Sequence, residues 1–276
     1  LMQPILSTLA EIYEALELPL RSIENEYGPG QIECTFDPLP VTSAADNFML
    51  FRTATRQVCR RHGYLASFMC KPAFEGYCPS GWHLHQSLVD SNTRKNLFAS
   101  EEEQKILSPL AKNYMAGLLE NAPASVVFAT PTVNGFRRFT PNSLAPDRAT
   151  WSHDHRGTMI RVLANSEKYN TRFENRIGEP AANPYLFMAS QIVGGLDGIN
   201  RNLKPSDADD APYEAPRTLL PKSLENALNK LDNSQLIREA FGDTYVDYYL
   251  GIKNAELDRY NSYTQENGNQ DDENGI

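Results

Sequence analysis

The sequence predicts an α+β fold. Segments with the period of a helix and shorter segments with the alternation of a strand follow one another irregularly along the 276 residues. They do not form the regular strand–helix–strand units of a parallel sheet. Hydrophobic residues make up 41% and charged residues 22% of the chain, which is the balance of a folded globular protein.

Helices are expected where apolar residues recur every three or four positions. The first covers residues 3–17 and the second 43–62. A third is expected over 101–120, because Ser100 and Glu103 have the spacing of a capping box. Further helices are expected over 184–201, 222–231, 233–241 and 243–260.

Strands are expected where polar and apolar residues alternate, or where a short apolar run lies between turn residues. A strand, a Gly/Pro turn and a returning strand are predicted across 26–33. Other strands are predicted at 82–88, 125–129, 159–163 and 172–177. Together these elements predict one catalytic domain over residues 1–262. The segment 263–276 has almost nothing to bury, and a disordered acidic tail is expected there.

Composition argues against several classes of protein. The net charge is −9 without a basic run, which is unfavourable for binding nucleic acid. No stretch approaches the roughly 20 apolar residues of a membrane span, and no secretory signal pattern opens the chain, so a cytoplasmic location is expected. The four cysteines form no CxxC pair, which favours reduced thiols over structural zinc. The opening Leu1-Met2 within a helical pattern suggests a segment of a longer protein.

Acidic and imidazole side chains occur at spacings that suit a metal. Glu26 and Glu33 flank a Gly-Pro-Gly turn, and a hairpin there would bring two carboxylates together, which is unfavourable without a cation or a proton. His83 and His85 share one face of a predicted strand. Oxygen ligands with an imidazole suit Mg²⁺ or Mn²⁺. The alternatives are two exposed loop acids and an ordinary pair of polar histidines.

Arginines are concentrated in the middle of this acidic chain. Arg172, Glu174 and Arg176 alternate on a predicted strand, which is compatible with a ladder of ion pairs. It is equally compatible with arginines that hold carboxylate or phosphate oxygens beside a metal-binding glutamate. Four more arginines precede this strand: Arg137, Arg138, Arg156 and Arg161. Their number favours a polyanionic substrate such as ATP.

Seven motifs occur in the order typical of one enzyme family. They are Glu26-x-x-Pro29-Gly30-Gln31-x-Glu33, Gly81-x-His83-x-His85-Gln86-Ser87-Leu88, Asn134–Pro141, Ala145-Pro146, Arg156–Arg161, Arg172-x-Glu174-x-Arg176 and Asn183-Pro184-Tyr185-Leu186. Over about residues 1–260 the chain resembles the C-terminal catalytic domain of the glutamine synthetase family. The resemblance implies an antiparallel sheet that forms half of an active-site barrel, wrapped by helices.

The family, which acts in nitrogen metabolism, condenses glutamate with an amine at the expense of ATP, through γ-glutamyl phosphate. The resemblance implies that Mg²⁺ or Mn²⁺ is bound by Glu26, Glu33, His83 and Glu174. It implies nucleotide contacts by His85, Gln86, Ser87, Arg156, Arg161 and Arg172. It places Arg138 and Arg176 at glutamate and Leu144 at the amine acceptor, with Arg156 and Arg176 as the catalytic arginines. A homo-oligomeric ring is also implied.

Three departures from the family pattern matter. The upstream Glu-x-Glu strand and the N-terminal β-grasp domain are not in this chain, so the 276 residues alone are expected to be inactive. The Asn-Gly that touches glutamate reads Cys78-Pro79. At the position where ammonia-using members have an acid that binds ammonium, this chain has Leu144, which cannot attract a cation. An organic amine acceptor is therefore predicted, with ordinary glutamine synthetase and a catalytically silent structural or regulatory relative as the alternatives.

Overall fold

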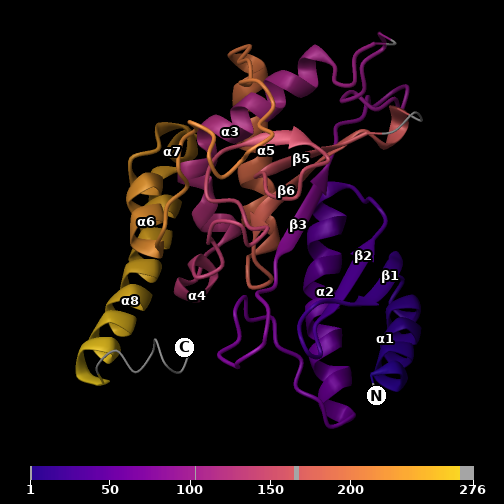
Figure 1. Ribbon diagram of the computed structural model, residues 1–276, viewed down its shortest axis with the longest axis vertical. Coiled ribbons are helices and arrows are strands. Elements are labelled where there is room, and N and C mark those ends of the chain that lie inside the picture. The colour runs from indigo at the N-terminus through magenta and orange to yellow at the C-terminus, as the bar shows by residue number, and fades with distance from the viewer. Residues whose placement is uncertain (1, 103, 165–167, 268–276) are drawn as a thin grey trace.

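The computed structural model describes residues 2–102, 104–164 and 168–267. Figure 1 shows a smaller N-terminal region beside a larger region that contains the main sheet. The N-terminal region consists of α1 (Gln3–Ala15), the antiparallel hairpin of β1 (Leu20–Asn25) and β2 (Ile32–Phe36), and α2 (Val41–Arg61). It has a hydrophobic core of its own, formed by Ile5, Leu9, Tyr13, Leu18, Val58 and Cys59.

The larger region is built on a four-stranded sheet. Its strands lie in the order β3 (Trp82–Gln86), β6 (Arg172–Gly178), β5 (Ile160–Leu163), β4 (Trp151–His153). The first two pairings are antiparallel, but β4 and β5 are parallel. The sheet is therefore mixed, and the prediction of an antiparallel sheet is wrong at this edge. The strands that the structure describes do not close into a barrel, and the half-barrel stays a prediction.

Two long helices cover one face of this sheet. They are α3 (Pro109–Ala129) and α5 (Pro184–Asn200). They cross closely because glycines meet there: a Cβ on Gly117 would lie 2.1 Å from the carbonyl oxygen of Gly194, and one on Gly198 would lie 2.1 Å from that of Asn113. The remaining helices are α4 (Val133–Phe136), the 3₁₀ turn η1 (Lys168–Asn170), α6 (Leu224–Asp232), α7 (Gln235–Phe241) and α8 (Asp243–Asn267).

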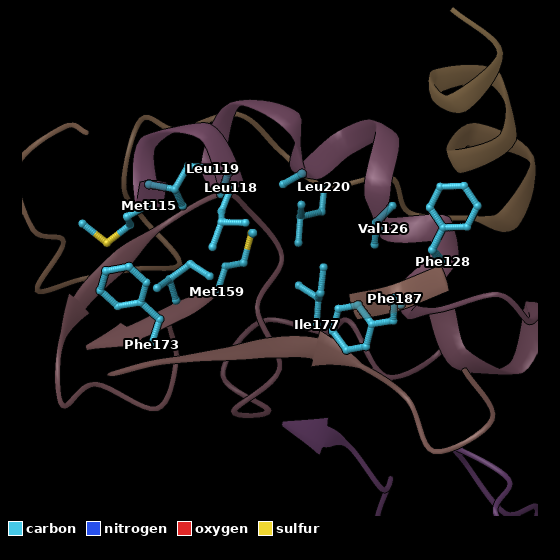
Figure 2. Close-up of a cluster of buried hydrophobic side chains, with 14 of the residues drawn as sticks. Met115, Leu118, Leu119, Val126, Phe128, Met159, Phe173, Ile177, Phe187 and Leu220 are labelled. Atoms are coloured by element: carbon cyan, nitrogen blue, oxygen red, sulfur yellow. The ribbon is translucent and has the colours of Figure 1, made fainter. Parts of the chain in front are cut away.

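The main core lies between α3, α5 and the sheet (Figure 2). Met115 and Leu118 of α3 lie over Phe173 and Ile177 of β6, and all four are buried. Because successive side chains of a strand point to opposite faces, Arg172, Glu174 and Arg176 are directed to the other face of β6. The apolar half of the strand fixes the sheet against the helices, and the charged half is left for a site.

Two predictions for the segment before and within α3 are wrong. Residues 125–129 form the last turns of α3 rather than a strand. All five are buried, and a short apolar run buried on every side has no period that separates helix from strand. The helix predicted over 101–120 begins at Pro109, where the Oγ of Ser108 accepts the amide of Ala111. The predicted capping partner, Glu103, lies outside the described residues.

The other helices are confirmed with shifts at their ends. The largest shift is at α8, which continues to Asn267 and so enters the predicted tail; the rest of that tail lies outside the described residues. The hairpin predicted across 26–33 exists, but residues 26–31 form its turn and the strands lie on either side. Within the described residues, none of the helices combines the length and apolar character needed to cross a membrane.

Candidate active site

The open face of the sheet brings together residues from β3, β5 and β6. The Nδ1 atom of His83 lies 3.2 Å from Oε1 of Glu174, which is only 2% exposed. Nη1 of Arg161 donates to the other carboxylate oxygen of Glu174 at 2.9 Å, and Arg176 pairs with Oε1. Since a buried carboxylate is costly unless it is paired, these arginines offset the cost of burying Glu174.

Both histidines are held in the neutral form. Burial lowers the pKa of His83 well below its usual value, and the charges of Arg176 and Arg138 add to the effect. Loss of solvent lowers the pKa of His85 to about 4, and Arg172, whose Nε donates to its Nδ1 at 3.1 Å, also lowers this pKa. A neutral imidazole can act as a metal ligand, which a protonated one cannot.

The hairpin carries a second set of acids. Glu33 lies directly opposite Glu24 in the β1–β2 pairing, and Glu26 follows β1. Partial burial raises the pKa of Glu33, and the neighbouring charges of Glu26, Glu24 and Glu174 raise it further. Glu26 is thus close enough to Glu33 for its charge to raise the pKa of Glu33. Glu24 belongs to none of the motifs, and only the strand pairing places it beside Glu33.

The donors suit a hard divalent cation in type but are not assembled into a site. Carboxylate oxygens and a neutral imidazole are ligands of Mg²⁺ and Mn²⁺. Among the described residues, however, there is no group of three or more His, Cys, Asp or Glu side chains that could hold a metal. The oxygens of Glu174 contact arginines instead. The metal site predicted from the sequence stays a prediction.

Arg138 and Arg176 are the buried cations nearest to the end of β6. Nη2 of Arg138 donates to the carbonyl oxygens of Ile177 at 2.8 Å and Gly178 at 2.9 Å. This contact fixes Arg138 to the strand, so the glutamate contact expected of it involves a guanidinium that is already partly engaged. The Nε atoms of Arg138 and Arg176 are both buried without a hydrogen-bond partner. Such donors favour an anionic ligand at this end of the strand.

Leu144 lies beside Arg176 on an irregular segment. Its side chain is 50% exposed, and its backbone has a φ of 61°. This left-handed conformation is unfavourable for a leucine by roughly 1–2 kcal/mol, and strain of this kind is concentrated at functional sites. The Leu144 carbonyl accepts from Nη2 of Arg176 at 3.5 Å. An apolar side chain is thus presented to solvent next to a buried cation.

The remaining predicted nucleotide residues are spread over both sides of the sheet. Arg156 is exposed in the turn before β5, and its charge is close enough to lower the pKa of Arg176. Ser87 is exposed directly after β3. Gln86 faces the helices, where its Oε1 accepts from Tyr114 Oη at 2.9 Å and its Nε2 donates to Gln191 at 3.3 Å. Strand alternation therefore separates Gln86 from His83 and His85.

Known proteins match nearly the whole chain. The family model described as glutamine synthetase, catalytic domain, matches residues 1–270. The chain is 51% identical over 247 residues to the gamma-glutamylanilide synthase of an Acinetobacter species, which covers 89% of this chain and 49% of that protein.

Relatives of lower identity match over a similar length of the chain. The chain is 34% identical over 256 residues to the glutamine synthetase of Clostridium saccharobutylicum, covering 90% of this chain and 57% of that protein. It is 31% identical over 262 residues to lengsin of Homo sapiens, covering 93% and 50%. The chain spans about half the length of these curated relatives.

Proposed function

The chain belongs to the glutamine synthetase family, and we propose that it is the catalytic part of an ATP-dependent ligase that joins the side-chain carboxylate of glutamate to an organic amine. The proposal of an organic amine rather than ammonium rests on Leu144. It presents an exposed apolar side chain where the family resemblance expects an acid that serves ammonium. The 51% identity to a protein named gamma-glutamylanilide synthase supports an aromatic amine.

The reaction has two steps. The glutamate carboxylate attacks the γ-phosphorus of ATP, which forms γ-glutamyl phosphate and releases ADP. The amine nitrogen then attacks the acyl carbon, phosphate leaves, and the nitrogen loses a proton. The arginines of the sheet suit the first step, because Arg161 and Arg176 place fixed positive charge on the face where phosphate charge would develop. Glu174 holds these two guanidinium groups in place.

A divalent metal fits the donor types present. Glu26, Glu33, His83 and Glu174 would hold Mg²⁺ or Mn²⁺, which would supply further positive charge to the phosphoryl oxygens. Because these donors are not grouped in this chain, we expect further ligands from outside it, as the resemblance implies. For the same reason the 276 residues alone are expected to lack ligase activity. A cytoplasmic location and a homo-oligomeric ring are also proposed from the resemblance.

The identity of the amine acceptor is tested by steady-state kinetics on the full-length protein. We expect kcat/KM for the best aryl, alkyl or polyamine acceptor to exceed that for ammonium. Burial of two or three methylene groups, at about 0.8 kcal/mol each, gives roughly a ten- to sixtyfold preference. Ammonium as the best acceptor would make the protein an ordinary glutamine synthetase. Absence of amine-dependent ADP formation with the whole panel would support a catalytically silent relative.

A further inference from the structure

Residues 70–80 form a loop that is closed at its base. The amide of Ser80 donates to the carbonyl of Cys70 at 2.7 Å, and the Cys70 thiol donates back to the carbonyl of Ser80 at 3.2 Å. The middle of the loop is exposed, and the ring of Phe74 packs against that of Tyr77. A loop whose ends meet in this way is a compact unit.

The base of this loop forms a wall of the site. A Cβ on Gly81, the residue that follows the loop, would lie 2.9 Å from Nε2 of His83 and 3.1 Å from Nη1 of Arg138. The loop therefore abuts the same buried guanidinium whose Nε has no partner. A displacement of the loop base would therefore change the space beside Arg138 and His83.

Asn134 of α4 holds the backbone of Lys71, the residue that follows Cys70. Its Oδ1 accepts the amide of Lys71 at 2.8 Å, and its Nδ2 donates to the carbonyl of Lys71 at 2.9 Å. This reciprocal pair reproduces the bonding of two antiparallel strands. On the other side of the loop, Nε2 of Gln31 donates to Ser80 Oγ at 2.9 Å and to the Pro79 carbonyl at 3.2 Å. Two side-chain amides thus hold the loop from opposite sides.

The helix that carries Asn134 is in turn fixed to the end of β6. Glu179, fully buried one residue after β6, accepts both the amide of Thr132 at 3.1 Å and its hydroxyl at 2.8 Å. The Thr132 hydroxyl accepts the amide of Gly135 at 2.9 Å and so caps α4. A Cβ on Gly135 would lie 2.6 Å from the Glu179 carboxyl carbon, so this contact requires glycine. The position of Asn134 is therefore set by the strand that carries Arg176.

We propose that Asn134 is a positioning residue for the carboxylate substrate: through Lys71 it holds the 70–80 loop in a fixed position beside the buried Arg138. This inference rests on the proposed function, which makes that substrate glutamate. Arg161 and Arg172, the groups assigned to ATP, bond instead to other residues: Asp154, Glu174, His85 and Asn170. Loosening the loop should therefore weaken the binding of glutamate and leave the binding of ATP unchanged.

The test compares Asn134→Ala with the wild-type protein at its encoded length. We expect KM for glutamate to rise about tenfold, because small displacements of positioning groups have large effects, while KM for ATP stays within twofold. Asn134→Asp keeps the acceptor for the Lys71 amide and loses the donor, and it is expected to raise the same KM. Asn233→Ala is the matched control, since Asn233 makes a side-chain bond to the backbone of α6 at 2.7 Å far from the site.

Loop opening is read independently by alkylation of cysteines followed by peptide mass spectrometry. Burial raises the pKa of Cys70 to about 12, so its thiol is protonated at pH 8, and the exposed Cys78 serves as the internal reference. Asn134→Ala should speed alkylation of Cys70 relative to Cys78 at least tenfold. Unchanged protection of Cys70 would overturn the proposal.

The kinetic outcomes separate this inference from the proposed function. An active wild-type protein with an unchanged glutamate KM in both Asn134 variants would overturn the inference alone. Equal rises in the KM values for glutamate and ATP, with a lower melting temperature, would indicate a merely structural role and would also overturn it. Absence of amine-dependent ADP formation in the wild-type protein would overturn the proposed function, and the inference with it. If Asn134→Ala does not fold, Asn134→Asp decides.

Discussion

The acidic residues of the β1–β2 hairpin and of the main sheet have opposite electrostatic surroundings. Glu174 of β6 is buried, and its two oxygens are paired with Arg161 and Arg176. Glu33 of β2 lies opposite another glutamate, Glu24, and its pKa is raised by partial burial and further by its acidic neighbours. The first carboxylate is already neutralised by the protein, and the second is surrounded by charge of its own sign.

This difference assigns the two regions different work. A carboxylate held between arginines organises fixed cations and contributes to stability only while its partners remain. Carboxylates that repel one another gain most from a cation that comes from outside the chain. We therefore expect the sheet to present fixed positive charge and the hairpin acids to depend more strongly on a bound cation. Substitution of single glutamates should separate the two.

The largest effect is expected for Glu174→Gln. Removal of this charge leaves Arg176 buried and unpaired, and we expect the free energy of unfolding to fall by about 3–5 kcal/mol. Urea-induced unfolding of the chain measures it. Glu33→Gln is the matched control in the hairpin and should change this free energy by no more than about 0.5 kcal/mol, or raise it. Equal losses in both variants would contradict the distinction between the two regions.

The acceptor side of the site differs from both regions because it lacks a carboxylate at position 144. Introducing one by Leu144→Glu should bring that position closer to an ammonium site. We expect the ten- to sixtyfold preference for organic amines over ammonium to narrow to less than about fivefold, because burial of apolar surface is lost and a cation is attracted. The ratio of kcat/KM values measures it in the full-length protein.

Leu144→Met is the control for this substitution, since it keeps an apolar side chain of similar volume. It should retain the preference for organic amines. If Leu144→Glu and Leu144→Met have the same ratio of ammonium to organic amine, position 144 does not set the acceptor.

Some features of the fold and the site could be predicted from short sequence patterns, and others could not. Seven short motifs in order predicted the family, which the family model confirms, and the nearness of His83 and Glu174 is confirmed by a 3.2 Å contact. The motifs are local patterns of residue types, whereas the nearness of His83 and Glu174 is implied by the family resemblance, which matches both to one metal. The course of α3 was not predictable from residues 125–129, because complete burial removes the amphipathic period.

The partners of buried charges were also not predictable. Arg138 was expected at glutamate, yet its Nη atoms bond the carbonyls at the end of β6. Glu179, which fixes α4, has no motif of its own in the sequence. Such contacts join segments that are distant along the chain, and a local pattern does not record which segments will pack together.

The third prediction concerns metal at the hairpin. At the encoded length, Mg²⁺ at ten times its dissociation constant should stabilise the wild-type protein by about 1.4 kcal/mol, because a ligand that binds only the folded state shifts unfolding by mass action. Glu33→Gln should reduce this gain by at least half. Thermal unfolding with and without Mg²⁺ measures it, with K⁺ at equal ionic strength as the control. An equal Mg²⁺ effect in both proteins would remove Glu33 from the metal site.

The smallest effect is expected for Glu24→Gln, measured without divalent metal. Glu24 faces Glu33 directly across the hairpin, and like charges in that position are destabilising on the scale of about 0.2–1 kcal/mol for a cross-strand pair. Removal of one charge should therefore raise the free energy of unfolding by an amount in this range. Glu14→Gln, an exposed acid on α1 of the same region, should leave it unchanged within error. The gain should shrink in 1 M salt, where the Debye length falls to about 3 Å. A loss of stability in Glu24→Gln, or a gain that salt does not affect, would show that the hairpin acids do not repel one another, and the electrostatic difference between hairpin and sheet would then rest on Glu174 alone.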